Sequence, residues 1–312
     1  MRWSDSRLVN AAGWIVGAGA ALFILGSLAS SIYLQRSFLK PKRKKNLTSN
    51  LEGFIPEAVY TTTPLQIRSM DGLRISSVIL TPESPNGHGI VVCHGLAHDK
   101  NSGIRFVQYL LNAGYTLLLL DFRNHGESDG NMTTYGYFEK YDLLAAIQHV
   151  RESLGPSARI GILGASMGAS IALMAAAETD DVQALVLDSP FASLKSISSE
   201  WAGQITRLPR FLLLLPLQMA YLWVLLQAGF PIPAVEPWRK AMSIKCPLFL
   251  IHGGADQLIG PHHSRQIYEN AAGEKELWIH EEAGHLGVYL VNTQEYQRRV
   301  LHFFRRNLLG PV

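Results

Sequence analysis

Short, almost purely apolar runs alternate with longer amphipathic segments from about residue 90 to the end of this 312-residue chain. The runs are three to five residues long, and a strand without polar positions has to be covered on both of its faces. Helices between such strands supply that cover in a parallel sheet. The pattern therefore predicts an α/β protein with a mostly parallel, doubly wound sheet. The predicted strands are Ile90–Cys93, Thr116–Leu120, Ile160–Leu163, Ala184–Leu187, Pro247–Ile251 and Leu277–Ile279.

The segments between the strands carry a helical repeat, and a hairpin precedes all of them. In residues 138–152, apolar side chains fall at positions i, i+3, i+4 and i+7, which gives a helix one apolar face. Asp71-Gly72 separates two extended runs, 65–70 and 73–80, and supplies the backbone angles of a tight turn. The sequence thus predicts an antiparallel N-terminal hairpin. The predicted helices are Phe106–Ala113, Phe138–Glu152, Met167–Ala177, Ser264–Ala272 and Gln294–Asn307.

Charge is distributed unevenly along the chain, whose net charge is +3. Residues 1–45 hold eight Lys or Arg and one acid, which leaves 20 basic and 24 acidic residues elsewhere and a net charge of −4 there. A nucleic-acid-binding surface would be basic, so we expect no nucleic-acid partner. Cys93 and Cys246 each lie in an apolar run, which predicts buried free thiols and favours a reducing compartment.

A charge-free stretch between Arg7 and Arg36 predicts one N-terminal transmembrane helix. The stretch is 28 residues long and most apolar at 11–34, whereas about 20 residues cross a bilayer core. Two basic residues precede it and six follow closely, so the positive-inside rule predicts a single-pass protein with residues 36 onward in the cytoplasm. The alternative is a signal peptide cleaved near residues 27–29. We favour the anchor because the apolar run continues past that site.

The segment Gly164-Ala-Ser166-Met-Gly168 fits the pattern G-x-S-x-G, and its setting is more informative than the match itself. A predicted strand leads in, and a predicted helix of small residues leads out. Flanking glycines permit a sharp turn that raises the Ser166 hydroxyl above the sheet edge, and the helix start offers N–H groups to an anion. The alternative is a plain turn with a capping serine.

Two later loops supply an acid and a histidine in the order that this chemistry uses. His252-Gly-Gly-Ala-Asp256 and Ala283-Gly-His285 each follow a predicted strand. Open α/β sheets build their sites at the carboxyl ends of strands, so these loops are expected near Ser166. Asp188 also ends a strand and is the second candidate for the acid.

These motifs resemble those of the α/β-hydrolase superfamily, most closely its serine-hydrolase branch of monoacylglycerol lipase-like and serine aminopeptidase-like proteins. The resemblance runs from about residue 60 to the end of the chain. It rests on six motifs in the same order: Cys93-His94-Gly95, Asp121 to Ser128, Gly164 to Gly168, Leu187 to Pro190, His252 to Asp256 and Ala283 to His285.

The resemblance implies the α/β-hydrolase fold and a role for each matching residue. Ser166 would be the nucleophile, His285 the general base and then acid, and Asp256 the group that orients the imidazole. Backbone N–H groups of Leu96 and Met167 would hold the oxyanion. We expect no metal and no organic cofactor. The pair His262-His263 could suggest a metal site, but no second ligand pair has suitable spacing, so we interpret it as a solvated helix terminus.

Residues 189–245 lie where this superfamily inserts a lid, and 211–235 within them carry no charge. By hydropathy this segment is a second candidate membrane contact. A single crossing here would separate the nucleophile from the acid and the histidine, and prolines at 216, 231 and 233 are expected to break the run into short pieces. We therefore predict a helical lid that covers an acyl pocket or touches the membrane. The alternative is ordinary burial in the core.

The sequence as a whole predicts an anchor at 1–35, a basic linker at 36–55 and a hydrolase domain at 56–312 with its lid insertion at 189–245. We expect hydrolysis of a carboxylic ester, with a small-molecule or lipid-like, long-acyl substrate. One alternative is an aminopeptidase-like amide hydrolase, which would need an acid in the pocket; another is a catalytically silent membrane-tethered binding protein, against which the filled triad argues. The candidate acids are Glu127, Glu139, Glu200 and Glu236.

Overall fold

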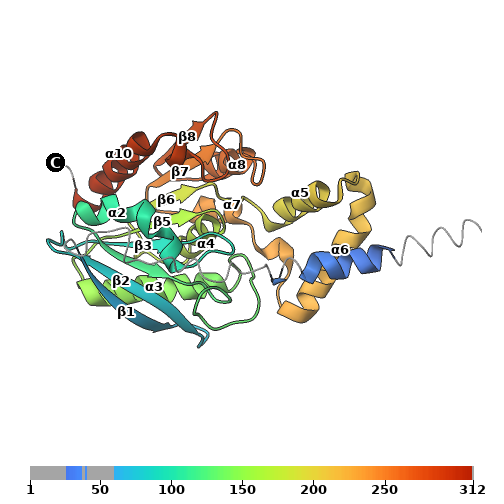
Figure 1. Cartoon of the computed structure of the whole chain (residues 1–312), viewed down its shortest axis with the longest axis horizontal. Helices are drawn as coiled ribbons and strands as arrows, with labels where there is room; N and C mark the ends of the chain where they lie inside the picture. The colour runs from blue at the N-terminus through green and yellow to red at the C-terminus, as the bar shows by residue number, and fades with distance from the viewer. Residues whose placement is uncertain (1–25, 37–38, 41–59, 311–312) are drawn as a thin grey trace, which may run out of the picture.

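The computed structural model describes residues 26–36, 39–40 and 60–310, and its centre is one eight-stranded sheet (Figure 1). The strands are β1 (Tyr60–Arg68), β2 (Arg74–Pro82), β3 (Gly89–Cys93), β4 (Thr116–Leu120), β5 (Ile160–Ala165), β6 (Ala184–Asp188), β7 (Leu248–Gly253) and β8 (Lys275–His280). Their order is β1-β2-β4-β3-β5-β6-β7-β8. All neighbouring pairs from β4 to β8 are parallel, while β2 is antiparallel to both β1 and β4. The predicted sheet and its antiparallel hairpin are confirmed.

The hairpin is longer than predicted. β1 begins at Tyr60, opposite Pro82, and the two strands stay in register as far as the pair Arg68 and Arg74. The run of threonines at 61–63 shows no alternation of apolar and polar residues, but its β-branched side chains favour an extended backbone. Gly72 turns the chain with φ +93°, a value that glycine adopts without a clash of Cβ.

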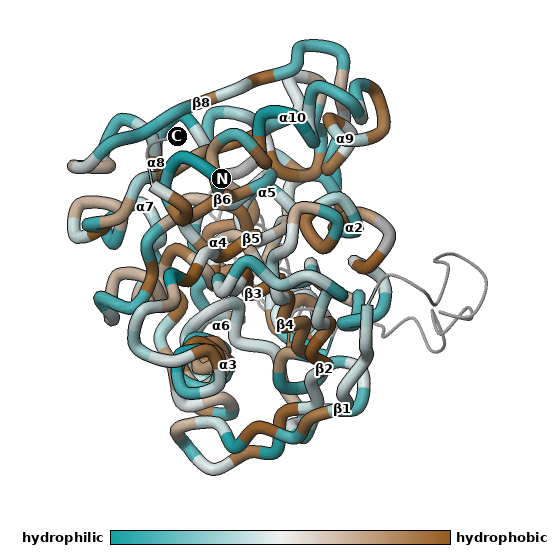
Figure 2. The backbone as a smooth tube through the Cα atoms, turned by 90° about the vertical axis from the view of Figure 1, so that its left-hand side faces the viewer, coloured by the Kyte–Doolittle hydropathy of each residue, from teal (hydrophilic) through white to brown (hydrophobic). Residues whose placement is uncertain are grey.

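Helices cover both faces of the sheet (Figure 1). Alternate residues of β4 contribute to two different hydrophobic cores, one on each face of the sheet, because successive side chains in a strand point to opposite faces. Leu118 contributes to the core with α3 and α4, and Leu117 to the core with α2 and α10. The central strands are accordingly brown in Figure 2. The helices that the sequence predicted are α2 (Ile104–Asn112), α3 (Glu139–Leu154), α4 (Met167–Ala176), α8 (His262–Asn270) and α10 (Thr293–Phe304).

Residues 189–245 form two long helices, α5 (Leu194–Thr206) and α6 (Arg210–Ala228), followed by η4 (Ile232–Ala234), α7 (Pro237–Lys240) and η5 (Ala241–Ser243). We call α5 and α6 the cap, which projects from one end of the sheet domain (Figure 1). α6 continues through Pro216, so the prediction that this proline breaks the run is wrong. A proline removes one helical hydrogen bond, but Leu213 and Leu217 on either side of it pack against Ala202 of α5.

α6 is the one helix in the described residues that has the length and composition of a membrane span. Its two ends nevertheless lead back to β6 and β7, which are hydrogen-bonded neighbours in the same sheet. A single crossing by α6 would place these two strands on opposite sides of a bilayer. We therefore assign α6 to the surface of the protein.

Residues 26–36 form a helix that lies across α6 (Figure 1). This helix includes the last part of the predicted anchor 11–34, whose residues before 26 lie outside the described part of the chain. Most of the predicted linker 36–55 lies outside it as well. Leu39, just after the helix, is buried in the main core, and its carbonyl accepts a hydrogen bond from Thr133 N–H (2.9 Å).

Both cysteines are buried free thiols, as predicted. Cys93 ends β3 and Cys246 precedes β7. Burial raises the pKa of both thiols, that of Cys246 to about 11, so neither is a nucleophile at neutral pH.

Candidate active site

Ser166 occupies the sharp turn between β5 and α4. Its backbone has φ +54° and ψ −119°, a conformation that a non-glycine residue adopts only where the surrounding structure imposes it. The flanking glycines are required by space: a Cβ on Gly164 would lie 2.6 Å from Ala169 Cα, and one on Gly168 would lie 2.5 Å from the carbonyl oxygens of Cys93 and His94. The two glycines thus let α4 start directly against the end of β3.

Two hydrogen bonds connect Ser166, His285 and Asp256. Ser166 Oγ lies 2.9 Å from His285 Nε2, and His285 Nδ1 lies 2.7 Å from Asp256 Oδ2. Asp256 comes from the loop after β7 and His285 from the loop after β8, so both follow parallel strands at the same sheet edge. The structure therefore brings together the three residues that the sequence predicted.

Asp256 is held as a carboxylate. Burial alone would raise its pKa, but hydrogen bonds from His252 and His285 and from the backbone N–H of Ile259 outweigh burial and hold the pKa of Asp256 well below its usual range. Sequence reasoning missed His252, which is completely buried 3.4 Å from Asp256 Oδ2. The signal that could have identified His252 is its position four residues before the acid, at the end of an apolar strand.

Asp188, the second candidate for the acid, lies next to the turn, and its hydrogen bonds go to residues other than His285. Its backbone carbonyl accepts a hydrogen bond from Ser166 N–H (2.8 Å), and its carboxyl group accepts one from Ser189 Oγ (2.9 Å). Burial raises the pKa of Asp188 despite hydrogen bonds from Ser189 and Tyr296. Asp188 therefore stabilises the Ser166 turn through its backbone carbonyl.

Two backbone N–H groups are available beside Ser166. Those of Met167, in the first turn of α4, and Leu96 have no acceptor among the described residues. The loop that carries Leu96 is close, since a Cβ on Gly95 would lie 3.3 Å from Ser166 Cβ. These are the two groups that the sequence predicted for an oxyanion hole.

The ring of His94 fixes the loop that contains Leu96. Its Nε2 accepts a hydrogen bond from Phe122 N–H (3.1 Å), so its proton is on Nδ1, which donates to Gly95 O (2.8 Å). Burial and the neighbouring His125 lower the pKa of His94 well below its usual value. The ring stays neutral and keeps both hydrogen bonds.

The motif Asp121 to Ser128 forms a rigid loop held by buried charges. Lys100 Nζ lies 2.8 Å from Asp121, and Arg123 pairs with Asp142 (2.6 Å) and Asp71 (2.7 Å). Each of these charges has a partner, as buried charges require. The motif therefore has a structural role, which is to hold this loop in place beside the site.

An apolar pocket of about 180 Å³ lies between the cap, the loop of Leu96 and the helix 26–36. Its wall on the cap side is fixed to the loop of Asp256, because Trp201 Nε1 donates to Leu258 O (2.9 Å) and Gln204 Nε2 donates to Gln257 O (2.8 Å). The lining residues are Tyr33, Leu34, Gln35, Leu96, Tyr135, Ser198, Trp201, Ala202, Ile205, Leu217, Ala220, Tyr221, Val224 and Ile232.

Comparison with known proteins identifies the family. The profile of the alpha/beta hydrolase fold matches residues 90–229. The protein YqkD of Bacillus subtilis (strain 168) is 30% identical over 244 residues, which cover 77% of this chain and 78% of YqkD. The chain belongs to the α/β-hydrolase family. Escherichia coli O157:H7 YfhR is similar to this α/β hydrolase over almost its whole length, with 23% identity over 301 residues that cover 93% of this chain and 95% of YfhR.

Solved structures similar to this α/β hydrolase include an esterase. The Pyrococcus furiosus esterase Pf2001 superposes with a TM-score of 0.69 and 27% identity, covering 87% of this chain and 98% of the esterase. The Pyrococcus horikoshii acylaminoacyl peptidase shares the fold, with a TM-score of 0.61 and 19% identity over 81% of this chain and 43% of the peptidase. The fold and the esterase neighbour support hydrolase activity.

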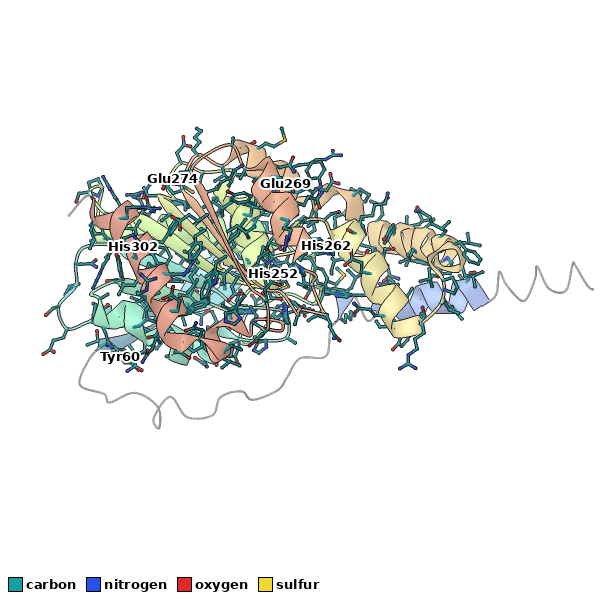
Figure 3. All side chains as sticks on the ribbon, turned by 90° about the horizontal axis from the view of Figure 1, so that it is seen from above. Tyr60, His252, His262, Glu269, Glu274 and His302 are labelled. Atoms are coloured by element: carbon teal, nitrogen blue, oxygen red, sulfur yellow. The ribbon has the colours of Figure 1, made fainter. Side chains whose placement is uncertain are left out.

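His262 and His263, at the start of α8, contact Glu200 of α5 at the junction of this α/β hydrolase with its cap. His262 is labelled in Figure 3. Each His Nε2 lies 3.3 Å from a Glu200 oxygen. The expectation of a solvated helix terminus is wrong for His263, which is completely buried and accepts a hydrogen bond from Ala192 N–H at its Nδ1 (3.2 Å). In the neutral ring the proton is then on Nε2, facing Glu200, which favours a hydrogen bond over a metal ligand. The absence of a metal stays a prediction.

The Glu200→Gln substitution should destabilise the protein at neutral pH. Burial opposes ionisation of Glu200, but the hydrogen bonds from His263 and Ser196, together with the nearby histidines, outweigh it and lower the pKa of Glu200 from 4.5 to about 2. A carboxyl with a lowered pKa stabilises the fold above its unfolded-state pKa and loses that contribution as the pH falls toward the folded-state value. We expect a loss of about 1 to 2 kcal/mol in the free energy of unfolding at pH 7, allowing for partial exposure.

Urea unfolding at pH 7 and at pH 3.5 measures this difference, which should be smaller at pH 3.5. Glu269→Gln is the matched control, because Glu269 is exposed on α8 (Figure 3). An equal effect of both substitutions at pH 7 would show that Glu200 does not hold the cap.

Proposed function

We propose that this α/β hydrolase cleaves carboxylic esters through an acyl-enzyme on Ser166. The observation that carries the proposal is the pair of hydrogen bonds that joins Ser166, His285 and Asp256 at the strained turn. As Ser166 Oγ attacks the ester carbonyl carbon, His285 Nε2 takes the hydroxyl proton and Asp256 stabilises the resulting imidazolium. The oxyanion accepts hydrogen bonds from the N–H groups of Leu96 and Met167.

After acting as a base, His285 acts as an acid to complete acylation, and it then acts as a base again in deacylation. His285 gives its proton to the alcohol oxygen as the C–O bond breaks, and the alcohol leaves. A water molecule then attacks the acyl carbonyl while His285 takes one of its protons, and the carboxylic acid leaves as Ser166 Oγ regains a proton. No cofactor takes part in this proposal.

The pocket favours an ester over an aminoacyl amide. An aminopeptidase-like enzyme would need an acidic side chain to bind the substrate amine, and all the described residues that line the pocket are uncharged. The four candidate glutamates have other partners: Lys100 for Glu127, Thr134 and Gly136 for Glu139, the two histidines for Glu200, and Arg239 for Glu236. A neutral, apolar acyl group fits this lining better.

A substrate panel tests the proposed function. The purified full chain is assayed with p-nitrophenyl esters from acetate to dodecanoate and with aminoacyl p-nitroanilides. We expect hydrolysis of the esters with a preference for acyl chains longer than acetate. Faster turnover of aminoacyl anilides than of every ester would contradict the proposal and favour the amide alternative.

Association with a membrane is proposed from the outward face of α6. Charge is absent from this face, and its leucines are exposed at 62% for Leu214, 56% for Leu222 and 68% for Leu226. A helix in water normally presents charged residues there. An apolar stripe interrupted only by the uncharged Gln218 fits insertion into the lipid headgroup region, alongside the proposed anchor in residues 11–34.

Replacing Leu222 and Leu226 with glutamate should weaken vesicle binding of a chain that begins at residue 25. Each leucine buries apolar surface in the bilayer interface, so we expect at least about a tenfold loss of affinity for phosphatidylcholine vesicles in a flotation assay. Met70→Glu, in the turn between β1 and β2, changes another exposed apolar residue as a control. Unchanged binding of the double variant would assign the stripe to a protein contact instead.

We place the hydrolase domain on the cytoplasmic side because six basic residues closely follow the apolar segment. Protease added outside intact cells should leave residues 60–310 uncut. Digestion of this domain from outside would contradict the proposed sidedness.

A further inference from the structure

Three parts of the chain that are distant in sequence build the apolar pocket. The cap supplies most of its lining, the loop beside Ser166 contributes Leu96, and the helix 26–36 contributes Tyr33, Leu34 and Gln35. Leu34 packs against α5 and α6 at once, in a small cluster with Ala202, Leu213 and Leu217. The end of the proposed membrane anchor is therefore part of the pocket wall.

Both ends of this wall are fixed. On the cap side, Gln35 Nε2 donates to Gln227 Oε1 (2.8 Å), and the face of the helix that holds Ser27, Ser31 and Gln35 is buried. On the domain side, Leu39 lies in the main core and accepts a hydrogen bond from Thr133, two residues before the pocket residue Tyr135. Small polar residues on such a face allow close helix packing.

The charge-free N-terminal stretch is long enough for both tasks. Of its 28 residues, 18 precede residue 26, close to the roughly 20 that cross a bilayer core, so the ten residues at 26–35 remain available to contact the cap. The exposed residues of the same helix include the apolar side chains of Ile32 and Tyr33, with Ser30 and Arg36 also exposed. The pocket wall thus lies next to the surface that we assign to the lipid headgroups.

We propose that the helix 26–36 is the wall that sets acyl-chain length, and that the substrate is an ester of one acyl chain of about six carbons or more, delivered from the membrane. This rests on the proposed ester hydrolysis at Ser166. An apolar cavity of about 150 Å³ holds benzene, so a pocket of about 180 Å³ has room for one such chain. Removal of residues 1–45 would then alter selectivity as well as location.

Leu34→Trp in the full chain, assayed in detergent micelles, tests the proposal. The larger side chain should exclude two or more methylene groups, each of which contributes about a factor of four to binding. We expect kcat/KM for p-nitrophenyl octanoate to fall at least about tenfold, with that for the acetate within about twofold. Ile32→Trp is the matched control, because Ile32 is on the same helix outside the pocket lining.

A second variant tests the same proposal without adding a larger side chain to the pocket wall. Gln227→Leu removes the hydrogen bond to Gln35 from the cap side and should also lower the octanoate-to-acetate ratio. An unchanged ratio in both variants, or an equal fall in Ile32→Trp, would overturn the assignment of the wall. Wild type that hydrolyses no ester and takes no fluorophosphonate on Ser166 would instead overturn the proposed function, and the substrate proposal with it.

Discussion

Ser166→Ala should lower ester hydrolysis by about 10⁴- to 10⁶-fold, because the variant has no oxygen to form the acyl-enzyme. The side chain of Ser166 is mostly buried and its hydroxyl is hydrogen-bonded to His285. This hydroxyl supports no core packing, so the melting temperature should change by only a few degrees. Initial rates with p-nitrophenyl butyrate and a thermal melt measure the two effects.

Ser153→Ala, at the end of α3, is the matched control for this substitution. Ser153 is exposed and its hydroxyl is hydrogen-bonded to the half-buried His149 on the same helix, so activity should stay at the wild-type level. Retention of more than about one hundredth of the wild-type activity by Ser166→Ala would be incompatible with nucleophilic attack by this residue.

Asp256→Asn should lower kcat by about 10⁴-fold, the loss that accompanies the wrong imidazole tautomer in a catalytic triad. An amide N–H facing His285 Nδ1 would favour a proton on Nε2, which could then no longer take the proton of Ser166. The substitution also removes the charge that stabilises the imidazolium. Steady-state kinetics with a soluble ester measure the loss.

Asp188→Asn separates the two acids that the sequence offered. The carboxyl group of Asp188 bonds to Ser189 and Tyr296 and not to His285, so we expect less than about a tenfold fall in kcat. A larger loss from Asp188→Asn than from Asp256→Asn would reverse the assignment of the acid.

Apolar runs and loop order were enough to predict the sheet and the residues that meet at its edge. β4 has the predicted bounds Thr116–Leu120, since no polar residue interrupts the run. Ser166, Asp256 and His285 could be predicted because parallel strands bring the loops that follow them to one edge. A local pattern is sufficient wherever the strand period and the topology determine the position.

Features that depend on tertiary contacts could not be read from the chain. α6 continues through Pro216, and the leucines on either side of this proline pack on α5. His263 is buried at a contact with Glu200 of α5. Leu39 lies in the predicted basic linker 36–55, yet it is buried in the core. The place of the helix 26–36 in the pocket wall follows from a hydrogen bond between residues 192 positions apart. No sequence period carries that information.

Covalent labelling with a fluorophosphonate, followed by mass-spectrometric mapping of the adduct, tests the central claim most directly. A serine activated by His285 attacks phosphorus, so we predict one adduct on Ser166 in the wild-type chain and none in Ser166→Ala. An adduct on a different serine, or no adduct on folded protein that is accessible to the reagent, would contradict the assignment of Ser166 as the nucleophile.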